Sequence, residues 1–290
     1  MRAQAPNATS FANRRRYFRT AVLLLAVGAL TACKTSQDAV NAANQLTNAS
    51  QQLNAYYSDL VQQVNDTVSL NEMQSQMLGI PFEQIDRDQL DTTRQELAKR
   101  AAMAHALGTL AQAYAGLAGS KAGTDIGTAA SALTTELAGM KAIPNGPAIS
   151  NLVMQASEDL VELIRTHKLH QSSGKIAEIV NAVNQMFQKE SPAYESINQQ
   201  RVVLAESLAV LLVEKDLVDV NPSLTPALKP FALNSKLPSG QTPAEVRNLA
   251  EEEITSRGIV EISDYDAATQ ALSTMLAATA KQIAAVASSR

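Results

Sequence analysis

Cysteine and tryptophan are almost missing from this chain of 290 residues, which contains one Cys and no Trp. A single Cys excludes a disulfide framework and any zinc site built mainly from Cys ligands. Aromatic residues make up only 4%, beside 12 Gly and 10 Pro, which argues against an all-β sandwich or barrel. The chain is nevertheless 46% hydrophobic and 18% charged, as is typical of a folded protein with a core.

The common sequence patterns of catalysis and phosphate binding are also missing. The chain has no G-x-S-x-G, no G-x-G-x-x-G and no H-E-x-x-H, and its Gly-rich stretch 116–123 lacks the Lys-Ser/Thr of a P-loop. Residues 172–175 fit the S-x-x-K of serine β-lactamases, but the accompanying S-D-N and K-T-G motifs do not occur. We therefore expect no enzymatic activity and no cofactor.

The N-terminal residues 1–33 have the pattern of a bacterial targeting segment. Four Arg between positions 14 and 19 precede an apolar run from Ala21 to Ala32, which is too short for a membrane span of about 20 residues. The run ends in Leu30-Thr31-Ala32-Cys33, which resembles the lipobox of bacterial lipoproteins. The resemblance implies that residues 1–32 are removed and that 33–35 form the anchor, with Cys33 as the lipidation site that carries acyl chains such as palmitate.

The resemblance also bears on localisation. Lys34 follows the lipobox Cys, where Asp commonly marks retention at the inner membrane of Gram-negative bacteria. The absence of Asp at this position implies localisation at the outer membrane, on the side that faces the periplasm, if the host is Gram-negative. Residues 15–18 (RRYF) resemble part of a twin-arginine export motif, but Arg19 and Thr20 replace the residues that usually follow. General secretory export is therefore favoured, and twin-arginine export stays open.

Charge argues against nucleic acid as a partner. Residues 1–32 carry five Arg and no acid, so the mature chain holds 19 basic and 28 acidic residues and a net charge of −9. Such a chain lacks the positive field that binds phosphate backbones. We expect its membrane contact to come from acyl chains on Cys33, and a further contact to come from a protein partner of unknown identity.

The first part of the mature chain predicts long helices. Residues 34–78 contain neither Pro nor Gly, which favours one helix over about 36–78 with a length of roughly 65 Å. A second helix is expected from Asp86 or Asp88 to about Ala118, and a third over 125–141. Small and apolar residues recur every three or four positions in the first helix: Ala39, Ala42, Leu46, Ala49, Leu53, Tyr56, Leu60 and Val64.

The second part predicts shorter helices separated by breaks. Helices are expected from near Ser150 to about 170, over 175–190, over 191–217, over 243–258 and from 263 almost to the end. The breaks are predicted at 171–174, at Ser191-Pro192 and at Gly258, where residues 258–262 are the one strand candidate. Residues 218–242 carry four Pro and are expected to form an extended strap.

Together these patterns predict an all-α fold. We expect an elongated bundle of about seven helices, with a long-helix and Ala-rich region over 36–143 and a helical core with the strap over 144–290. Side-chain size further suggests that residues 202–213, which are nearly all apolar, are the most buried segment. On this hypothesis the first helix is exposed to partners, and Leu211→Ala costs more stability than Leu46→Ala.

Few residues are candidates for chemistry. His167 and His170 lie three positions apart, but two imidazoles do not make a metal site, and the local pattern favours a polar helix end. His105 lies among Ala and is expected to be an ordinary helix residue. Acidic clusters at 86–91, 251–253 and 264–266 are typical of helix N-termini and solvated faces. No catalytic, cofactor-binding or metal residue is predicted.

The sequence therefore favours a lipid-anchored protein of the cell envelope that acts as a binding or scaffolding component. One alternative is a small-ligand-binding lipoprotein with a pocket among the helices of 150–290. A weaker alternative is an enzyme that uses the region of His167 and His170. A membrane-active, toxin-like helical protein is a further alternative, prompted by the Gly- and Ala-rich stretch 104–142.

Overall fold

The computed structural model describes residues 34–118, 124–164, 168–215 and 244–289. Within these ranges all regular structure is helical, so the predicted all-α class is confirmed. Cys33, His167 and the expected strap over 218–242 lie outside the described residues. The described ranges contain six helices: α2 (Lys34–Leu78), α3 (Gln84–Ala118), α4 (Thr124–Ala138), α5 (Ser150–Ile164), α6 (Leu169–Glu214) and α8 (Ala244–Ser288). None of the helices in this part of the chain combines the length and the apolar content that a bilayer span requires.

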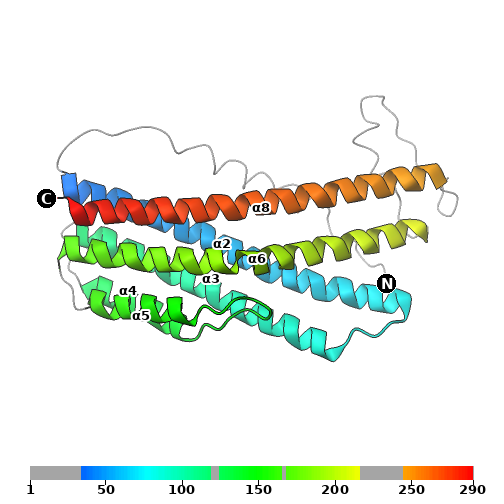
Figure 1. Ribbon diagram of the computed structural model, residues 1–290, viewed down its shortest axis with the longest axis horizontal. Coiled ribbons are helices and arrows are strands. Elements are labelled where there is room, and N and C mark those ends of the chain that lie inside the picture. The colour runs from blue at the N-terminus through cyan, green and yellow to red at the C-terminus, as the bar shows by residue number, and fades with distance from the viewer. Residues whose placement is uncertain (1–33, 119–123, 165–167, 216–243, 290) are drawn as a thin grey trace, which may run out of the picture. The chain divides into compact units, whose positions relative to one another are not determined.

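Helices α2 and α3 form an antiparallel pair (Figure 1). Two hydrogen bonds fix their register: the Ser36 hydroxyl donates to the Ala118 carbonyl at 2.5 Å, and the Asn54 amide donates to the Ala101 carbonyl at 3.3 Å. The Gly79-Ile80-Pro81 sequence ends α2 as predicted, because Gly79 adopts a positive φ of 67° that most side chains disfavour.

Helices α6 and α8 form a second antiparallel pair (Figure 1). Near one end, Nδ1 of His170 lies 3.0 Å from the Val286 carbonyl oxygen. Further along, the Gln188 amide donates to the Ser273 hydroxyl at 2.8 Å. The α3 helix also runs antiparallel to α6, since the hydroxyls of Tyr114 and Ser173 lie 2.7 Å apart and Arg100 pairs with Glu190.

Helix α2 contributes to the core along much of its length. All eight positions of its predicted seam are buried, and Leu46 is 0% exposed. The helix is contacted from several sides, because it meets α3 as described and Tyr56 contacts both Phe187 of α6 and Tyr265 of α8. The prediction that this helix would be the element most exposed to partners is therefore wrong.

The segment 202–213 of α6 is less buried than its composition suggested. Val202 and Leu208 are buried, but Val203 is 49% exposed and Leu211 is half-buried. The end of this segment packs on α8 through a small cluster of Val213 with Ala250 and Ile254. Burial depends on how many helices surround a residue and not only on its size, which is why the expected ranking of the two segments was wrong.

Two predicted helix breaks within α6 do not occur. The helix runs continuously from Leu169 to Glu214, with Pro192 inside it. Pro192 has no N–H with which to pair the carbonyl of Gln188, one turn earlier. The Ser191 hydroxyl donates to that carbonyl at 3.0 Å instead, so the residue before the proline satisfies the acceptor that Pro192 leaves open.

The break predicted at Gly258 does not occur either, and the strand candidate 258–262 is helical within α8. A Cβ atom at Gly258 would lie 3.2 Å from Cγ1 of Val202 and 3.1 Å from a carboxylate oxygen of Glu206. The glycine therefore serves the close approach of α6 and α8 and does not end the helix.

Gly108 of α3 permits a similar close approach to α2. A Cβ atom there would lie 2.7 Å from Oγ of Ser50, whose hydroxyl donates to the Thr47 carbonyl at 2.8 Å. Because Ala is favoured over Gly in a helix by about 1 kcal/mol, Gly108→Ala should gain that amount only in a Ser50→Ala background. A double-mutant cycle of urea unfolding measures this coupling. The same gain in both backgrounds would contradict the close packing of the two helices.

Candidate functional site

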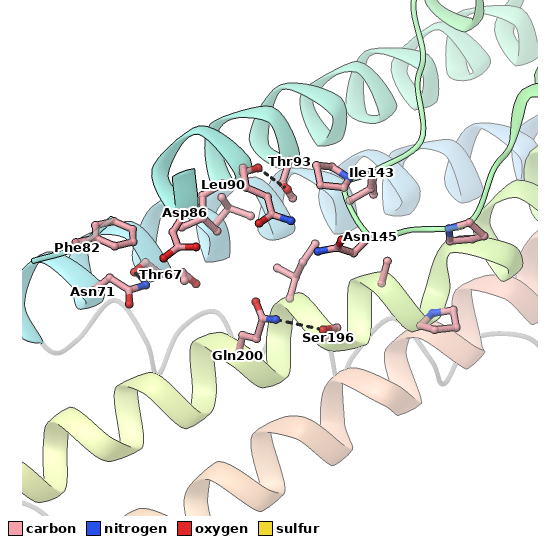
Figure 2. A pocket seen from close by; sticks show the side chains of 17 residues that line it. Thr67, Asn71, Phe82, Asp86, Leu90, Thr93, Ile143, Asn145, Ser196 and Gln200 are labelled. Carbon is pink, nitrogen blue, oxygen red and sulfur yellow. Dashed lines mark hydrogen bonds between the residues drawn. The ribbon is translucent and has the colours of Figure 1, made fainter. Parts of the chain in front are cut away.

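A cleft of about 430 Å³ lies where α2, α3 and α6 meet the connection between α4 and α5 (Figure 2). The α2 wall comes from its last third, the α3 wall from its first third, and the α6 wall from the turns after Pro192. One alternative drawn from the sequence was a ligand pocket among the helices of residues 150–290, and that range supplies only the α6 wall of this cleft. The polar groups that line the cleft are Thr67, Asn71, Asp86, Gln89, Thr93, Asn145, Ser196 and Gln200.

The loop wall of the cleft is a tight turn whose sequence fits its geometry. In Ile143-Pro144-Asn145-Gly146, the Gly146 N–H donates to the Ile143 carbonyl at 2.8 Å, and Asn145 adopts a positive φ of 61°. Proline at the second position and asparagine at the left-handed third position are typical of a type II turn. A Cβ at Gly146 would lie 3.0 Å from the Ile143 carbonyl and 3.7 Å from Cβ of Ala193, so the turn lies directly against α6.

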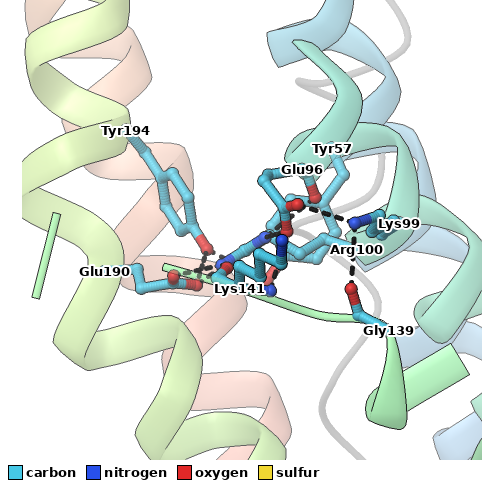
Figure 3. Close-up of polar contacts among 8 residues, drawn as sticks. All are labelled: Tyr57, Glu96, Lys99, Arg100, Gly139, Lys141, Glu190 and Tyr194. Atoms are coloured by element: carbon cyan, nitrogen blue, oxygen red, sulfur yellow. Dashed lines mark hydrogen bonds and ion pairs between the residues drawn. The ribbon is translucent and has the colours of Figure 1, made fainter. Parts of the chain in front are cut away.

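Three polar side chains of α3 hold the start of this loop (Figure 3). The Lys99 ammonium donates to the Gly139 carbonyl at 2.9 Å. The Lys141 backbone N–H donates to Oε2 of Glu96 at 2.8 Å, and Nη2 of Arg100 donates to the Lys141 carbonyl at 2.8 Å. These bonds tie both the N–H and the C=O of one loop residue to α3, which limits the movement of the cleft wall that follows.

Arg100 also joins α3 to α6 through a buried ion pair with Glu190. The two side chains are 0% and 1% exposed, and the guanidinium makes two hydrogen bonds to the carboxylate, one of them from Nε at 2.8 Å. The Tyr194 hydroxyl donates to the same carboxylate at 2.6 Å. Bidentate, charge-assisted hydrogen bonds of this kind fix the relative orientation of the two side chains as well as their distance.

The ionisation of Arg100 and Glu96 in this network depends on their hydrogen-bond partners. Burial alone would lower the pKa of Arg100, but the hydrogen bond to Glu190 raises the pKa above its ordinary value. Burial alone would raise the pKa of Glu96, but hydrogen bonds from Lys99 and from the Lys141 N–H lower the pKa below its ordinary value. The guanidinium and the Glu96 carboxylate therefore stay ionised at neutral pH.

An aromatic cluster supports the network from the side of α2 and α8. The rings of Tyr56 and Tyr57 approach Phe187 and Tyr194 at centroid distances of 5.2 to 6.2 Å, mostly edge to face, and Tyr265 tilts against Tyr56 at 5.3 Å. Such pairs stabilise packing beyond the area that they bury. Tyr194 belongs to both groups, so the ion pair and the aromatic core form one continuous set of contacts.

The residues singled out from the sequence do not gather at the cleft. His170 is bonded to the end of α8, and His105 is exposed on α3. No three His, Cys, Asp or Glu side chains in the described ranges come close enough to hold a metal ion. Of the acidic clusters, only Asp86 lines the cleft.

The Arg100–Glu190 pair was missed, although the sequence contained a signal for it. Arg100 stands seven positions before Leu107 and fourteen before Tyr114, and a spacing of seven places all three on one face of α3, where Leu107 and Tyr114 are buried. Glu190 likewise follows Phe187 by three positions on the buried face of α6. A charged residue in a buried row requires a partner, and one such residue on each of two helices suggests that they pair.

Asp86 is the one ionisable group among the described residues that line the cleft, and the others offer hydroxyl, amide and apolar surface. That chemistry suits recognition by hydrogen bonds and shape. It does not assemble the paired acid and base, or the nucleophile and base, of a hydrolytic site. Comparison with known proteins gives no match for this chain among protein-family models, curated proteins or solved structures.

Proposed function

We propose that this chain is a lipid-anchored binding protein of the cell envelope and that the cleft between α2, α3 and α6 is its ligand site. The observation that carries the proposal is the network around Arg100, which holds the cleft wall through Lys141 and joins α3 to α6. A buried ion pair is weak support for stability alone, because desolvation of the charges offsets their attraction. The bond from Arg100 to Lys141, two residues before the lining residue Ile143, supports a positioning role.

Preformation matters because a site that is already ordered loses little conformational entropy when a ligand binds. The cleft wall is fixed at the loop start by α3 and at the turn by contact with α6. Its volume of about 430 Å³ falls within the range of small-molecule sites, about 300–1,000 Å³. We infer that recognition, and not catalysis, is the activity of this site.

Capture of the natural ligand tests the proposal directly. Protein purified from its own envelope should carry a small molecule that native mass spectrometry detects as a mass increment. Ser196→Trp should abolish the increment, because Ser196 lines the cleft and a large ring would fill it. Ser207→Trp is the matched control, since Ser207 is exposed on the same helix and does not line the cleft. A ligand retained equally by both variants would contradict the assignment.

The anchor is proposed at Cys33, which precedes the first residue of α2 in the sequence. Cys33→Ala should abolish labelling with a clickable palmitate analogue and move the protein from the membrane fraction to the soluble fraction. Lys34→Asp is the control, which should keep the label while favouring the inner over the outer membrane of a Gram-negative host. Undiminished labelling of the Cys33→Ala protein would refute the lipidation site.

Scaffolding of a protein partner is a second candidate, favoured by one observation. Met154 is 59% exposed and Val161 43% exposed on the outer face of α5, where apolar side chains have no evident structural role. A photo-crosslinking residue at Met154 should then yield one discrete adduct in the native envelope, while one at exposed Asn151 should yield less. Absence of an adduct from Met154 would remove this candidate.

A further inference from the structure

We infer that the cleft takes an uncharged carbohydrate of about disaccharide size. This inference rests on the proposed function, since it names the ligand class of the same site. Three properties of the lining support it: its charge, its hydrogen-bonding capacity and its apolar surface (Figure 2).

The charge of the lining disfavours an anionic ligand. No Lys, Arg or His is among the described residues that line the cleft, and Asp86 adds a negative charge. Arg87 and Arg201 each follow a lining residue in the sequence, but both are paired with carboxylates. Arg87 is paired with Glu72 at 2.5 Å and lies 4.5 Å over the ring of Phe82, and Arg201 is paired with Glu261. Phosphate, sulfate or carboxylate groups would therefore be desolvated in the cleft without a positive partner.

The polar groups can both donate and accept hydrogen bonds, as sugar hydroxyls do. Four lining residues carry carboxamides, each with N–H donors and a C=O acceptor: Asn71, Gln89, Asn145 and Gln200. The buried hydroxyls of Thr67 and Thr93 donate to backbone carbonyls at 2.8 and 2.9 Å, which leaves their oxygens as acceptors. The Asn71 amide donates to the Thr67 carbonyl at 2.9 Å, so its side-chain oxygen is left to accept.

The remaining lining is apolar and largely rigid. It includes Pro144 and Pro147 of the loop, Pro192 of α6, and the side chains of Leu90 and Ile143. A purely apolar ligand would remove water from the amides and hydroxyls without replacing their hydrogen bonds, which is unfavourable. A pyranose ring combines apolar C–H faces with a rim of hydroxyls and so matches both kinds of surface.

Titration with defined sugars tests the ligand class. The lipidated protein is purified in a zwitterionic detergent without a sugar headgroup, and cellobiose and N,N′-diacetylchitobiose are titrated by calorimetry. At least one should bind saturably to the wild type. Gln200→Met should weaken that binding about tenfold, the equivalent of one hydrogen bond. Gln199→Met, one residue away but outside the lining, should bind like the wild type.

Two further variants test whether the loss of a lining carboxamide, and not a nearby change of charge, weakens sugar binding. Asn145→Gly removes the loop carboxamide but accepts the positive φ of 61° without strain, and it should also weaken binding about tenfold. Asp88→Asn, which removes an exposed carboxylate outside the lining, should leave affinity for a neutral sugar unchanged. Equal affinities for Gln200→Met and Gln199→Met would overturn the inference.

Further titrations distinguish an error in the carbohydrate inference from an error in the proposed function. Spermidine and an acetylated, amidated tripeptide are titrated in parallel with the two sugars. Binding of either one that Ser196→Trp abolishes, with no sugar binding, would overturn the carbohydrate inference and leave the cleft as a ligand site. No binding of any probe, with no ligand on protein from the native envelope, would overturn both.

Discussion

Replacement of Arg100 by Met should lower the free energy of unfolding by about 3–5 kcal/mol, because it leaves a buried carboxylate without its charged partner. In the folded protein Glu190 is 1% exposed and would retain only the hydrogen bond from Tyr194. The carbonyl of Lys141 would lose a donor as well. Urea unfolding followed by circular dichroism measures the loss.

Two comparisons separate this effect from the general loss of an arginine. Arg94 lies on the same helix and pairs with Asp91 at 2.8 Å, but both side chains are about half exposed, so Arg94→Met should change stability by about 0.5 kcal/mol or less. The double variant Arg100→Met/Glu190→Met should be more stable than Arg100→Met alone, because no unpaired charge remains. Strictly additive losses would contradict a buried, mutually dependent pair.

Leu46→Ala should destabilise the protein by about 2–5 kcal/mol, the range for a fully buried leucine whose removal leaves a cavity. Leu46 is 0% exposed on α2, a helix that contacts α3, α6 and α8. Leu211→Ala should cost only about 1 kcal/mol, because Leu211 is half-buried on the segment of α6 that packs on α8. Chemical unfolding of the two variants compares them, and the opposite order would contradict the central position of α2.

The sequence predicted which positions of α2 are buried but not how much the helix contributes to the core and to stability. The spacing from Ala39 to Val64 identifies one face, because a helix brings every third or fourth residue to the same side. The number of neighbours that cover that face depends on tertiary contacts, which the local pattern does not contain. The small side chains of α2 suggested exposure, whereas at Ser50 a small side chain permits the close approach of α3 at Gly108.

Helix breaks were over-predicted for a related reason. Pro192 and Gly258 are unfavourable in an isolated helix, and the local sequence indicates an end at each. Within the fold, the Ser191 hydroxyl and the contact between Gly258 and Val202 offset the local preference. At Pro192 the compensation is local, from Ser191 to Gln188, whereas at Gly258 it depends on the close approach of α6, which a window of neighbouring residues does not contain.

The cleft could not be predicted because its walls come from separate parts of the chain. Thr67, Asp86, Asn145 and Ser196 meet only when α2, α3, the loop and α6 are assembled (Figure 2). Of these residues only Asp86 stood out in the sequence, as a member of an acidic cluster at a helix start. The one usable signal was the pair of charged residues in otherwise apolar rows, which identifies the ion pair but not the cleft.

Side-chain amide NMR is the most direct measurement of whether the cleft is a preformed ligand site. The amide signals of Asn and Gln, assigned by substitution, are followed while a cocktail of neutral sugars, diols and small amides is added. We expect saturable shifts for Asn71, Gln89, Asn145 and Gln200, while Gln199 stays unchanged. Saturable shifts confined to other parts of the protein, or none at all, would contradict a ligand site between the loop and α6.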